Sequence, residues 1–396
     1  MKTTAALLPG ALLDDGRPAT LGVMGGGQLG RMFVQAAQEM GFVTVVLDPD
    51  HASPAGAVAH HHIRAGYLDE QGLAQLMQRA SAITTEFENV PAAALLTLGA
   101  QRPVAPASDA VAVCQDRSAE KRHFAGCGVP CAPWTLIESA GQLAAVSDDL
   151  LPGILKTARM GYDGKGQVRV ADRAQLAAAW DELGQVPCVL EKMLPLALEI
   201  SVIVARAADG TVVNFPVQQN LHRDGILAVT QVPAPGVSEA LQQQAVQCAQ
   251  AVAQSLRYVG VLCVEFFVLQ DGSLVANEMA PRPHNSGHYS IDACDQSQFD
   301  LQVRTLAGLP LTPPRLHSCA VMLNLLGELW FDAQGRERSP AWVQVLALPG
   351  VHLHLYGKAA PRPGRKMGHL TVTAPDAAGA RAVALQAAAL LGLAPF

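Results

Sequence analysis

The feature that most constrains the fold is a glycine-rich turn between an apolar strand and a helix near the start of the chain. Residues 20–24 form a short apolar run, residues 25–30 (GGGQLG) follow, and residues 31–41 place apolar side chains at helical spacing. A β-branched run, 43–47, ends at Asp48. Since strand, turn, helix and strand make a βαβ unit, the sequence predicts a parallel sheet.

Composition excludes several classes of protein. The 396 residues are 50% hydrophobic and 16% charged, so the chain is not globally disordered. A net charge of −6 offers no overall attraction for nucleic acid or anionic lipid, and no apolar run approaches the ~18 residues of a membrane span. The eight cysteines form no CxxC pair, which predicts reduced thiols in a cytoplasmic protein. Residues 1–19 are predicted to be a dispensable extension rather than a signal peptide.

The rest of the chain alternates strands and helices. A polar helix is expected over 116–127 and a longer one over 237–256, with strands at 154–156, 186–191 and 199–205. The segment LPLTPP at 309–314 is a predicted linker into a small β-rich tail.

Asp271-Gly272 separates two β-rich runs, 261–269 and 274–278, and predicts a hairpin. A two-residue loop pairs Gln270 with Ser273 and therefore Glu265 with Glu278. Two opposed carboxylates about 5 Å apart repel each other, and a divalent cation such as Mg²⁺ would convert the repulsion into coordination. A register error of one residue, or an outward-facing pair with solvent partners, is the alternative.

Two further patterns indicate phosphate. Lys156 ends a strand before a loop with glycines at 161, 164 and 166, a combination suited to polyphosphate, although a surface lysine before a flexible loop is the alternative. The GxGxxG turn with Asp48 fits a dinucleotide site, or it only makes a tight turn.

Basic and histidine clusters are weaker signals. Lys358 and residues 362–366 (RPGRK) form a basic cluster that is either a solvated turn or a holder of a phosphorylated substrate. Residues 60–62 (HHH) cannot all ligate one ion from a regular strand, because neighbouring side chains point to opposite faces. Asp292, Cys294 and Asp295 are interpreted as structural.

Six motifs together resemble the N5-carboxyaminoimidazole ribonucleotide synthetase family, ATP-grasp enzymes of purine biosynthesis. They are GGGQLGRM (25–32), TEFENVP (85–91), GYDGKGQ (161–167), NLHRDGIL (220–227), NEMAPRPHNSGH (277–288) and GRKMGHL (364–370). They span residues 20 to 373 in family order. The sequence departs from the family where arginine and glycine are usual, at Ala158 and Met160.

The resemblance implies an ATP-grasp fold of mixed α/β and α+β class. Residues 1–19 would be the extension, 20–115 a Rossmann-like domain, 116–312 the ATP-grasp lobes and 313–396 a small β-rich C-terminal domain. It also implies a homodimer, and small-molecule substrates rather than nucleic acid or a membrane.

The resemblance assigns the site residues as follows. Glu265 and Glu278 would carry Mg²⁺. Catalytic roles fall to Lys156, Tyr162, Asp163, Arg282 and His284. ATP would contact Arg117, Lys156, Gly161, Tyr162, Asp163, Gly164, Lys165, Gly166, Gln167, Glu191, Lys192, Met193, Leu194, Glu199, His222, Asn277 and Glu278. The ribonucleotide would contact Gln28, Leu29, Glu86, Asn285, Lys358, Arg365 and Lys366, so the GxGxxG turn would meet this substrate and not a dinucleotide.

The implied reaction joins 5-aminoimidazole ribonucleotide, ATP and bicarbonate through carboxyphosphate. The nearest alternative is a formate-using glycinamide ribonucleotide transformylase. Residues 162–163 and the RPHNSGH string favour the carboxylating enzyme instead. An NAD-dependent oxidoreductase would leave Lys156 and the paired glutamates unexplained. A catalytically silent nucleotide-binding protein finds no support, since these three residues are intact.

Overall fold

The computed structural model describes residues 6–161 and 166–396, and its first sheet has the predicted βαβ topology. The order is β3-β2-β1-β4 and every pair is parallel, which confirms the parallel sheet. The strands are β1 (Thr20–Met24), β2 (Val43–Leu47), β3 (His61–Ile63) and β4 (Ala82–Thr85), and the following helices are α1 (Gln28–Glu39), α2 (Glu70–Arg79), α3 (Ala92–Gly99) and α4 (Ser108–Cys114).

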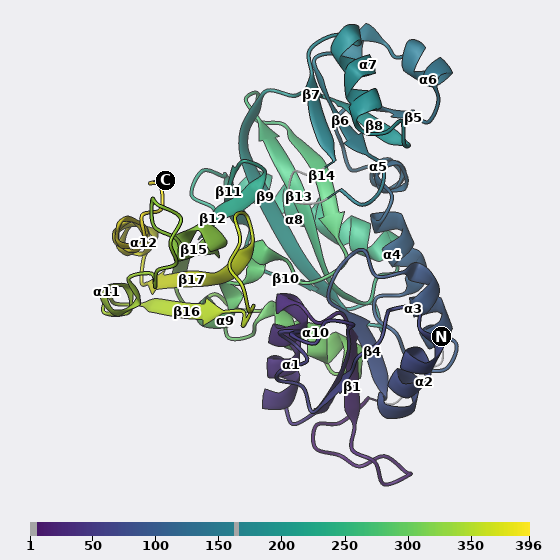
Figure 1. Cartoon of the computed structure of the whole chain (residues 1–396), viewed down its shortest axis with the longest axis vertical. Coiled ribbons are helices and arrows are strands. Elements are labelled where there is room, and N and C mark those ends of the chain that lie inside the picture. The colour runs from purple at the N-terminus through teal and green to yellow at the C-terminus, as the bar shows by residue number, and fades with distance from the viewer. Residues whose placement is uncertain (1–5, 162–165) are drawn as a thin grey trace.

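A helix from much later in the chain packs against this first sheet (Figure 1). α10 (Gln298–Ala307) places Phe299 and Val303 in one core with Phe33 of α1. Its Gln302 Nε2 donates to Thr84 Oγ1 at 3.2 Å. The N-terminal sheet is therefore joined to the central part of the chain by buried contacts.

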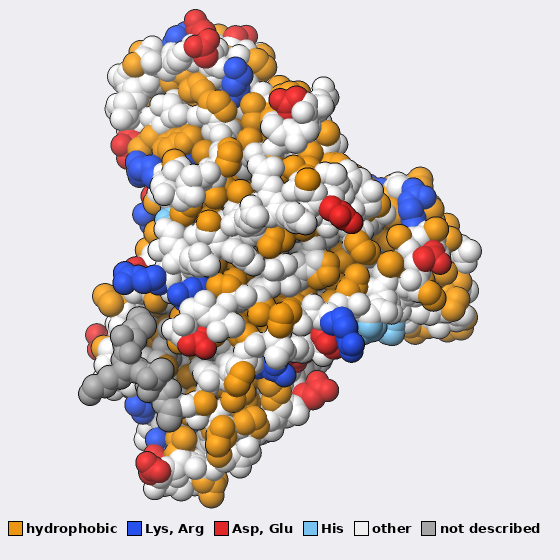
Figure 2. All heavy atoms as spheres, turned by 180° about the vertical axis from the view of Figure 1, so that it is seen from behind, with side chains coloured by type: hydrophobic (Ala, Val, Ile, Leu, Met, Phe, Trp, Pro, Cys, Tyr) orange, Lys and Arg blue, Asp and Glu red, His pale blue; other side chains and the backbone are white. Residues whose placement is uncertain are grey.

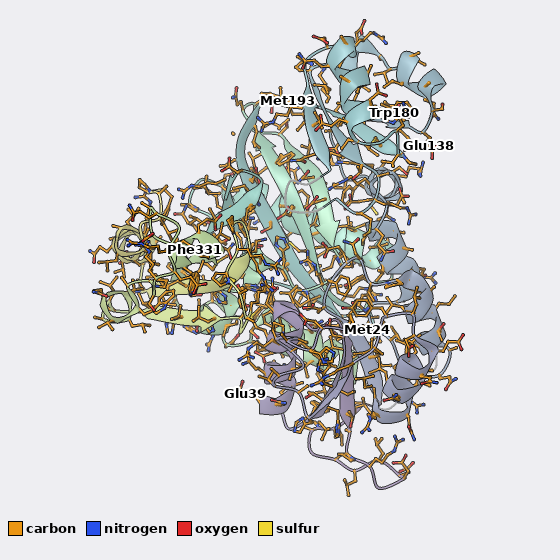
Figure 3. All side chains as sticks on the ribbon, viewed as in Figure 1. Met24, Glu39, Glu138, Trp180, Met193 and Phe331 are labelled. Atoms are coloured by element: carbon orange, nitrogen blue, oxygen red, sulfur yellow. The ribbon has the colours of Figure 1, made fainter. Side chains whose placement is uncertain are left out.

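A second, antiparallel sheet forms a separate lobe at the top of Figure 1, with order β5-β8-β6-β7. α5 (Arg117–Gly126), with Asp116 as its N-cap, leads into this lobe. The lobe contains β5 (Trp134–Ile137), α6 (Ala140–Ala144), β6 (Gly153–Thr157), β7 (Gln167–Val170), α7 (Arg173–Glu182) and β8 (Cys188–Lys192). Met193 follows β8, where the lobe meets the long central strands (Figure 3).

The third sheet has nine strands in the order β14-β13-β9-β11-β12-β15-β17-β16, with β10 beside β9. Its first part comprises β9 (Leu196–Arg206), β10 (Val212–Asn214), β11 (Gln218–Arg223), β12 (Ile226–Val232), α8 (Glu239–Ser255), β13 (Gly260–Leu269), β14 (Leu274–Ala280) and α9 (Ser290–Ala293). The C-terminal segment adds β15 (Cys319–Leu326), α11 (Trp342–Leu346), β16 (Val351–Leu355), β17 (Lys366–Ala374) and α12 (Ala377–Leu391). Because β12 pairs with β15, the C-terminal strands extend the central sheet instead of forming one of their own.

The predicted hairpin exists, but its loop is one residue longer than expected. Leu269 N–H donates to Ser273 O at 2.9 Å, so residues 270–272 make the turn, with Gly272 at φ +83°. Phe266 consequently pairs with Ala276. A bulge then shifts the register between Phe266 and Glu265, and Glu265 pairs with Glu278 after all. The predicted glutamate pairing is confirmed, while the two-residue loop that led to it is wrong.

The remaining features of the fold are the N-terminal extension, the cysteines and the charged surface. In the described part of the extension, residues 6–19, Leu7 N–H donates to Ala307 O of α10 at 2.8 Å, and Leu7 and Leu13 pack against the core shared by α1 and α10. All eight cysteines are free thiols. Among the described residues, no helix is long and apolar enough to cross a membrane. On the face seen in Figure 2, lysine and arginine side chains lie singly or in small groups between apolar and uncharged atoms.

Candidate active site

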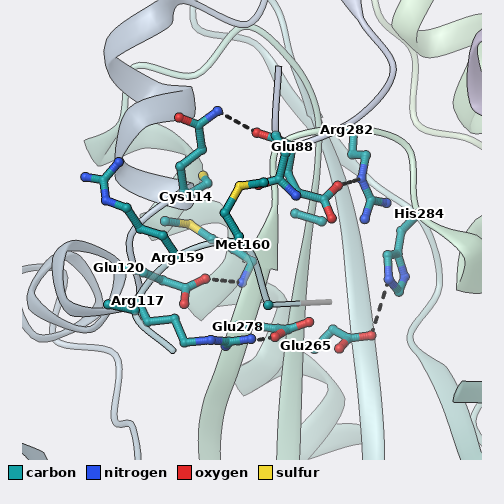
Figure 4. Close-up of a pocket in the computed structure, with 16 residues that line it drawn as sticks. Glu88, Cys114, Arg117, Glu120, Arg159, Met160, Glu265, Glu278, Arg282 and His284 are labelled. Carbon is teal, nitrogen blue, oxygen red and sulfur yellow. Dashed lines mark hydrogen bonds and ion pairs between the residues drawn. The ribbon is translucent and has the colours of Figure 1, made fainter. Parts of the chain in front are cut away.

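A pocket opens between α5, residues 158–161, the β13–β14 hairpin and residues 282–284 (Figure 4). Predicted site residues that meet there come from four separate segments: Arg117, Gly161, Glu265, Glu278, Arg282 and His284. Glu88 and Glu120, which the sequence did not single out, line the same pocket. The arrangement places carboxylates and cations together in one partly enclosed space.

Glu265 shows the electrostatic effect of the glutamate pair. Burial, and then the charge of Glu278, raise the pKa of Glu265 to about 7. Glu265 Oε1 is buried and accepts no hydrogen bond from the described residues. Arg117 Nη1 lies 3.1 Å from Glu278 Oε2. Two opposed carboxylates, one of which has an oxygen that accepts no hydrogen bond, fit a divalent cation such as Mg²⁺.

Arg282 and His284 line the pocket beside Glu265. The Arg282 guanidinium donates to Glu88 in a close ion pair, and burial of Arg282 is outweighed by the Glu88 charge, which raises the arginine pKa. His284 Nε2 lies 3.5 Å from Glu265 Oε1. Burial, with the nearby charges of Arg282 and Lys366, holds the pKa of His284 well below its usual value. The imidazole is therefore neutral at physiological pH, and one of its ring nitrogens can accept a hydrogen bond.

Lys156 is buried on β6 and shares a carboxylate with a second lysine. Glu191 Oε2 lies 3.2 Å from Lys156 Nζ and 3.1 Å from Lys121 Nζ. Burial lowers the Lys156 pKa, although Glu191 opposes that effect. Glu191 Oε1 is buried with no hydrogen-bond partner in the described chain, so one acceptor remains unused beside this pair.

The remaining predicted ATP residues occupy the strands around this lysine pair. Lys192 ends β8, and the Met193 amide donates to Pro152 O at 2.9 Å. His222 Nδ1 on β11 lies 2.5 Å from Glu199 Oε2 on β9. Burial disfavours the charged ring, but the contact with Glu199 and the charge of Glu265 outweigh it and raise the pKa of His222. Leu194 lies in the short connection between β8 and β9, which we call the hinge. Asn277 lies on β14 beside Glu278, and Gln167 begins β7.

The predicted phosphate loop lies largely outside the described residues. Tyr162, Asp163, Gly164 and Lys165 are not described, while Gly161 and Gly166 flank them. Gly166 O accepts a hydrogen bond from Thr157 N. Met160, where the resembling family usually has glycine, has φ +63° and is 71% exposed. That left-handed conformation is strained for a residue with a Cβ, whereas glycine adopts it freely.

The glycine amides of the GxGxxG turn are occupied by partners within the protein. Gly27 N and Gly30 N donate to the two oxygens of Glu86 at 2.6 and 2.8 Å, and Gly26 N donates to Asp48 Oδ2 at 2.7 Å. Asp48 and Glu86 therefore neutralise the positive end of α1. Gln28 and Leu29 begin that helix next to the carboxylate of Glu86.

The basic cluster is divided between a loop and a strand. Lys366 opens β17, and its charge acts to lower the pKa of Glu88, Glu265 and His284, although it is not one of the residues that line the pocket. Lys358 Nζ donates to Lys366 O at 2.7 Å, whereas the half-buried Arg365 donates to Ala360 O at 2.7 Å. Asn285 exchanges two hydrogen bonds with Asn324 of β15, at 3.0 and 2.7 Å.

A histidine cluster lies near α9. Asp292, His354 and His369 form a group whose ligand atoms are within 4.8 Å of one another in the described chain. The His354 and His369 rings, however, stack at 4.5 Å with planes 12° apart. In-plane lone pairs of two stacked rings run side by side and do not converge on one ion, so this arrangement favours a structural role for Asp292.

Three residues missed by sequence reasoning complete the site: Glu88, Glu120 and Lys121. Glu88 lies within the TEFENVP motif, two positions after the predicted Glu86. Glu120 and Lys121 lie in a polar helix whose composition does not distinguish buried from solvent-facing charges. Only burial distinguishes Glu120 and Lys121 from the other charged residues of this helix, since their exposed fractions are 2% and 0%.

Family models cover the three parts of the chain in order. The ribonucleotide synthetase preATP-grasp domain matches residues 19–115, and the ATP-grasp domain matches residues 122–299. The phosphoribosylaminoimidazole carboxylase C-terminal domain matches residues 320–383. The chain therefore has an ATP-grasp fold with the expected N-terminal and C-terminal companions.

Curated relatives and solved structures agree with these models. The N5-carboxyaminoimidazole ribonucleotide synthase of Brucella melitensis is 44% identical over 89% of this chain and 96% of its own. That of Bacillus subtilis is 39% identical over 89% and 91%. The ADP complex of an N5-carboxyaminoimidazole ribonucleotide synthetase matches with a TM-score of 0.88 at 38% identity, covering 97% and 98% of the two chains. An Aspergillus clavatus enzyme in complex with ADP and the aminoimidazole ribonucleotide matches with a TM-score of 0.86 at 31% identity, covering 95% and 99%.

Proposed function

Because the chain belongs to the N5-carboxyaminoimidazole ribonucleotide synthetase family of ATP-grasp ligases, we propose that it carboxylates 5-aminoimidazole ribonucleotide. ATP and bicarbonate are the co-substrates, and ADP, phosphate and the N5-carboxy product are released. The observation that carries the proposal is the pocket in which Glu265 and Glu278 face Arg117, Arg282 and His284. The paired glutamates and the buried Lys156 have no role in an oxidoreductase.

The ATP phosphates are assigned to Lys156 and Arg117, with Gly161–Gln167 covering them. The adenine is assigned to the Glu191–Leu194 hinge and the ribose to Glu199, beside His222. Lys156 and Arg117 are both paired with carboxylates in the structure, at 3.2 and 3.1 Å. These contacts are available for exchange, since a polyphosphate offers each cation a stronger anionic partner.

Glu265 and Glu278 would hold Mg²⁺, with the side chain of Asn277 nearby. When bound, the ion supplies positive charge that offsets the charge of the phosphate oxygens. The chain's own contribution is to hold the two carboxylates opposite each other on one hairpin, within reach of Arg117.

The chemistry then proceeds in two steps. A bicarbonate oxygen attacks the γ-phosphorus, and ADP leaves, so that carboxyphosphate forms. The exocyclic amine of the ribonucleotide attacks the carboxyl carbon of carboxyphosphate, or CO₂ released from it, and phosphate departs. Arg282, held by Glu88, is assigned to the bicarbonate and carboxyl oxygens, and the neutral His284 is assigned to orient the amine by accepting a hydrogen bond from it. The proton released by the amine leaves with the departing phosphate. Tyr162 and Asp163 are assigned here from their motif alone.

The ribonucleotide is assigned to the space between α1 and the C-terminal strands. Lys358, Arg365 and Lys366 would bind its 5′-phosphate with the Gln28–Leu29 backbone, and Glu86 and Asn285 would lie near the ribose or base. The charge of Lys366 acts on Glu88 and His284, and this supports the assignment because it relates the proposed phosphate site to residues of the pocket.

The test is ADP release measured with each substrate omitted in turn. We expect release that requires both 5-aminoimidazole ribonucleotide and bicarbonate, and that glycinamide ribonucleotide with formate cannot replace. ADP release that does not depend on the aminoimidazole ribonucleotide, or that is faster with formate, would contradict the proposal.

A homodimer and a cytoplasmic location are also proposed. Sedimentation would test the homodimer, and the cysteine pattern supports the location.

Arg365→Ala is expected to raise KM for 5-aminoimidazole ribonucleotide and to leave KM for ATP nearly unchanged. Loss of one charge-assisted contact costs about 1.5–3 kcal/mol, or roughly 10- to 150-fold in affinity. Uniform substrate binding affects KM and not kcat. Arg336→Ala, which removes an exposed arginine paired with Asp332, is the control. An equal rise in both KM values would place the basic cluster at the nucleotide instead.

Lowering the pH from 8 to 6 is expected to raise the Mg²⁺ concentration needed for half-maximal ADP release. The pKa of Glu265 is raised to about 7, so below that pH the carboxyl carries a proton and is lost as a ligand. The ionised fraction falls roughly tenfold over this interval, and the Mg²⁺ requirement should rise by a similar factor. Mg²⁺–ATP association in the same buffers is the control. A requirement that stays constant or falls would show that Glu265 does not hold the ion.

A further inference from the structure

β14, which carries Glu278, is the edge strand of the nine-stranded sheet. Its only neighbouring strand is β13, and this ladder is interrupted by the bulge next to Glu265 and Glu278. On the outer side, Ala276 N donates to Pro130 O at 2.7 Å and Ala276 forms an isolated parallel bridge with Cys131, two residues before Glu278. A bulge leaves one residue unpaired and bends the strand, and an edge strand presents its outer amides and carbonyls without sheet partners. The position of Glu278 therefore depends on what holds the outer side of β14.

Two consecutive residues of α5 hold that side. Lys121 Nζ donates to Asn277 O at 3.0 Å, and Met279 N donates to Glu120 Oε1 at 2.6 Å. These backbone groups belong to the residues immediately before and after Glu278. The side chains of Glu120 and Lys121 thus replace the missing neighbouring strand at the position of Glu278; Figure 4 shows Glu120 beside this wall of the pocket.

Lys121 also reaches the other lobe. Its ammonium group, fully buried, lies 3.1 Å from Glu191 Oε2, the same oxygen that contacts Lys156 at 3.2 Å. If Lys156 turned toward a phosphate, Glu191 would keep Lys121 as a partner. Without Lys121, the departure of Lys156 would leave a buried carboxylate uncompensated, which is costly.

We propose that Glu120 and Lys121 are positioning residues that fix Glu278 opposite Glu265 and free Lys156 to move between Glu191 and the ATP phosphates. The inference rests on the proposed function and adds two residues that act through the backbone of β14 and through Glu191. Lys121 couples the phosphate lysine in one lobe to the metal strand in the other, and Glu120 secures that strand through a single accepted hydrogen bond.

The test uses four variants on α5. Lys121→Met removes the cation at nearly constant length, and Arg122→Met removes the next cation, which is exposed and donates to Ser118 Oγ. Glu120→Leu removes the acceptor for the Met279 amide, whereas Glu120→Gln retains a carbonyl oxygen there. Thermal unfolding shows which variants are folded.

Mn²⁺ binding in the presence of ADP, followed by the electron paramagnetic resonance signal of free Mn²⁺, gives a readout that needs no turnover. We expect about tenfold weaker binding in Lys121→Met and Glu120→Leu, and wild-type binding in Arg122→Met and Glu120→Gln. In the ADP-release assay, Lys121→Met should lower kcat about tenfold or more, with KM for the aminoimidazole ribonucleotide within twofold of wild type.

Wild-type Mn²⁺ binding and kcat in folded Lys121→Met would overturn the role of Lys121. A Glu120→Gln variant as weak as Glu120→Leu would overturn the hydrogen-bond role of Glu120. If Lys121→Met does not fold, the two Glu120 variants carry the test of strand positioning. Failure of the wild-type protein to release ADP with these substrates would reject the proposed function, while Mn²⁺ binding would still report on the positioning residues.

Discussion

Glu278→Gln is expected to reduce kcat for ADP formation by roughly a hundredfold or more while the protein remains folded. The substitution removes one of the two carboxylates assigned to Mg²⁺, and charge stabilisation by a bound metal is worth several kcal/mol in the transition state. Folding should survive, because removing one of two opposed carboxylates relieves their repulsion. The measurement is ADP release against Mg²⁺ concentration, with thermal unfolding in parallel.

The matched control is Glu239→Gln, which neutralises an exposed carboxylate in the first turn of α8, far along the chain from the hairpin. It should leave both the rate and the Mg²⁺ dependence unchanged. Normal Mg²⁺-dependent turnover in Glu278→Gln would remove this residue from the metal site and leave the pairing with Arg117 as its only role.

Lys156→Met should lower kcat by about 10- to 150-fold, with a smaller effect on the affinity for ATP. A charge-assisted contact of about 1.5–3 kcal/mol is lost, and the contact strengthens as charge shifts onto the transferred phosphate group. The variant should fold, because Glu191 retains Lys121 at 3.1 Å when Lys156 is removed.

Single-turnover ADP formation, compared with equilibrium ATP binding, separates these two effects. Arg173→Met serves as the control, since it removes a half-exposed cation of the same lobe that pairs with Asp148. A Lys156→Met enzyme with unchanged turnover would refute the phosphate role, and a loss confined to ATP binding would place Lys156 away from the reacting phosphate.

Much of the local structure could be predicted from the sequence because backbone geometry sets its periodicity. The bounds of β1 and β2 match the prediction, and the polar helix predicted over 116–127 is α5. Residue spacing also predicted that Glu265 faces Glu278. The sequence did not show how this pairing arises. The turn is one residue longer than predicted, and the bulge shifts the register back by one residue, so the two shifts cancel.

The candidate site could be predicted only in part. The NEMAPRPHNSGH motif singled out Arg282 and His284, and Lys156 was singled out because it ends a strand before a loop with several glycines. The roles of Glu88, Glu120 and Lys121 could not be predicted, since a polar helix gives no sign of which charges it buries. Glu86 was predicted to meet the substrate, and the structure shows in addition that it accepts the amides of Gly27 and Gly30.

The sequence by itself determined the βαβ start, the hairpin and the order of the motifs, because each depends on neighbours within a few residues. The tertiary structure alone decided that α10 packs on the first sheet and that β15 continues the central one. It also decided that Lys121 joins Glu191 to the backbone of β14. Such contacts join residues separated by up to several hundred positions, and the shape and burial of the packed chain, rather than any local pattern, determine which charges meet.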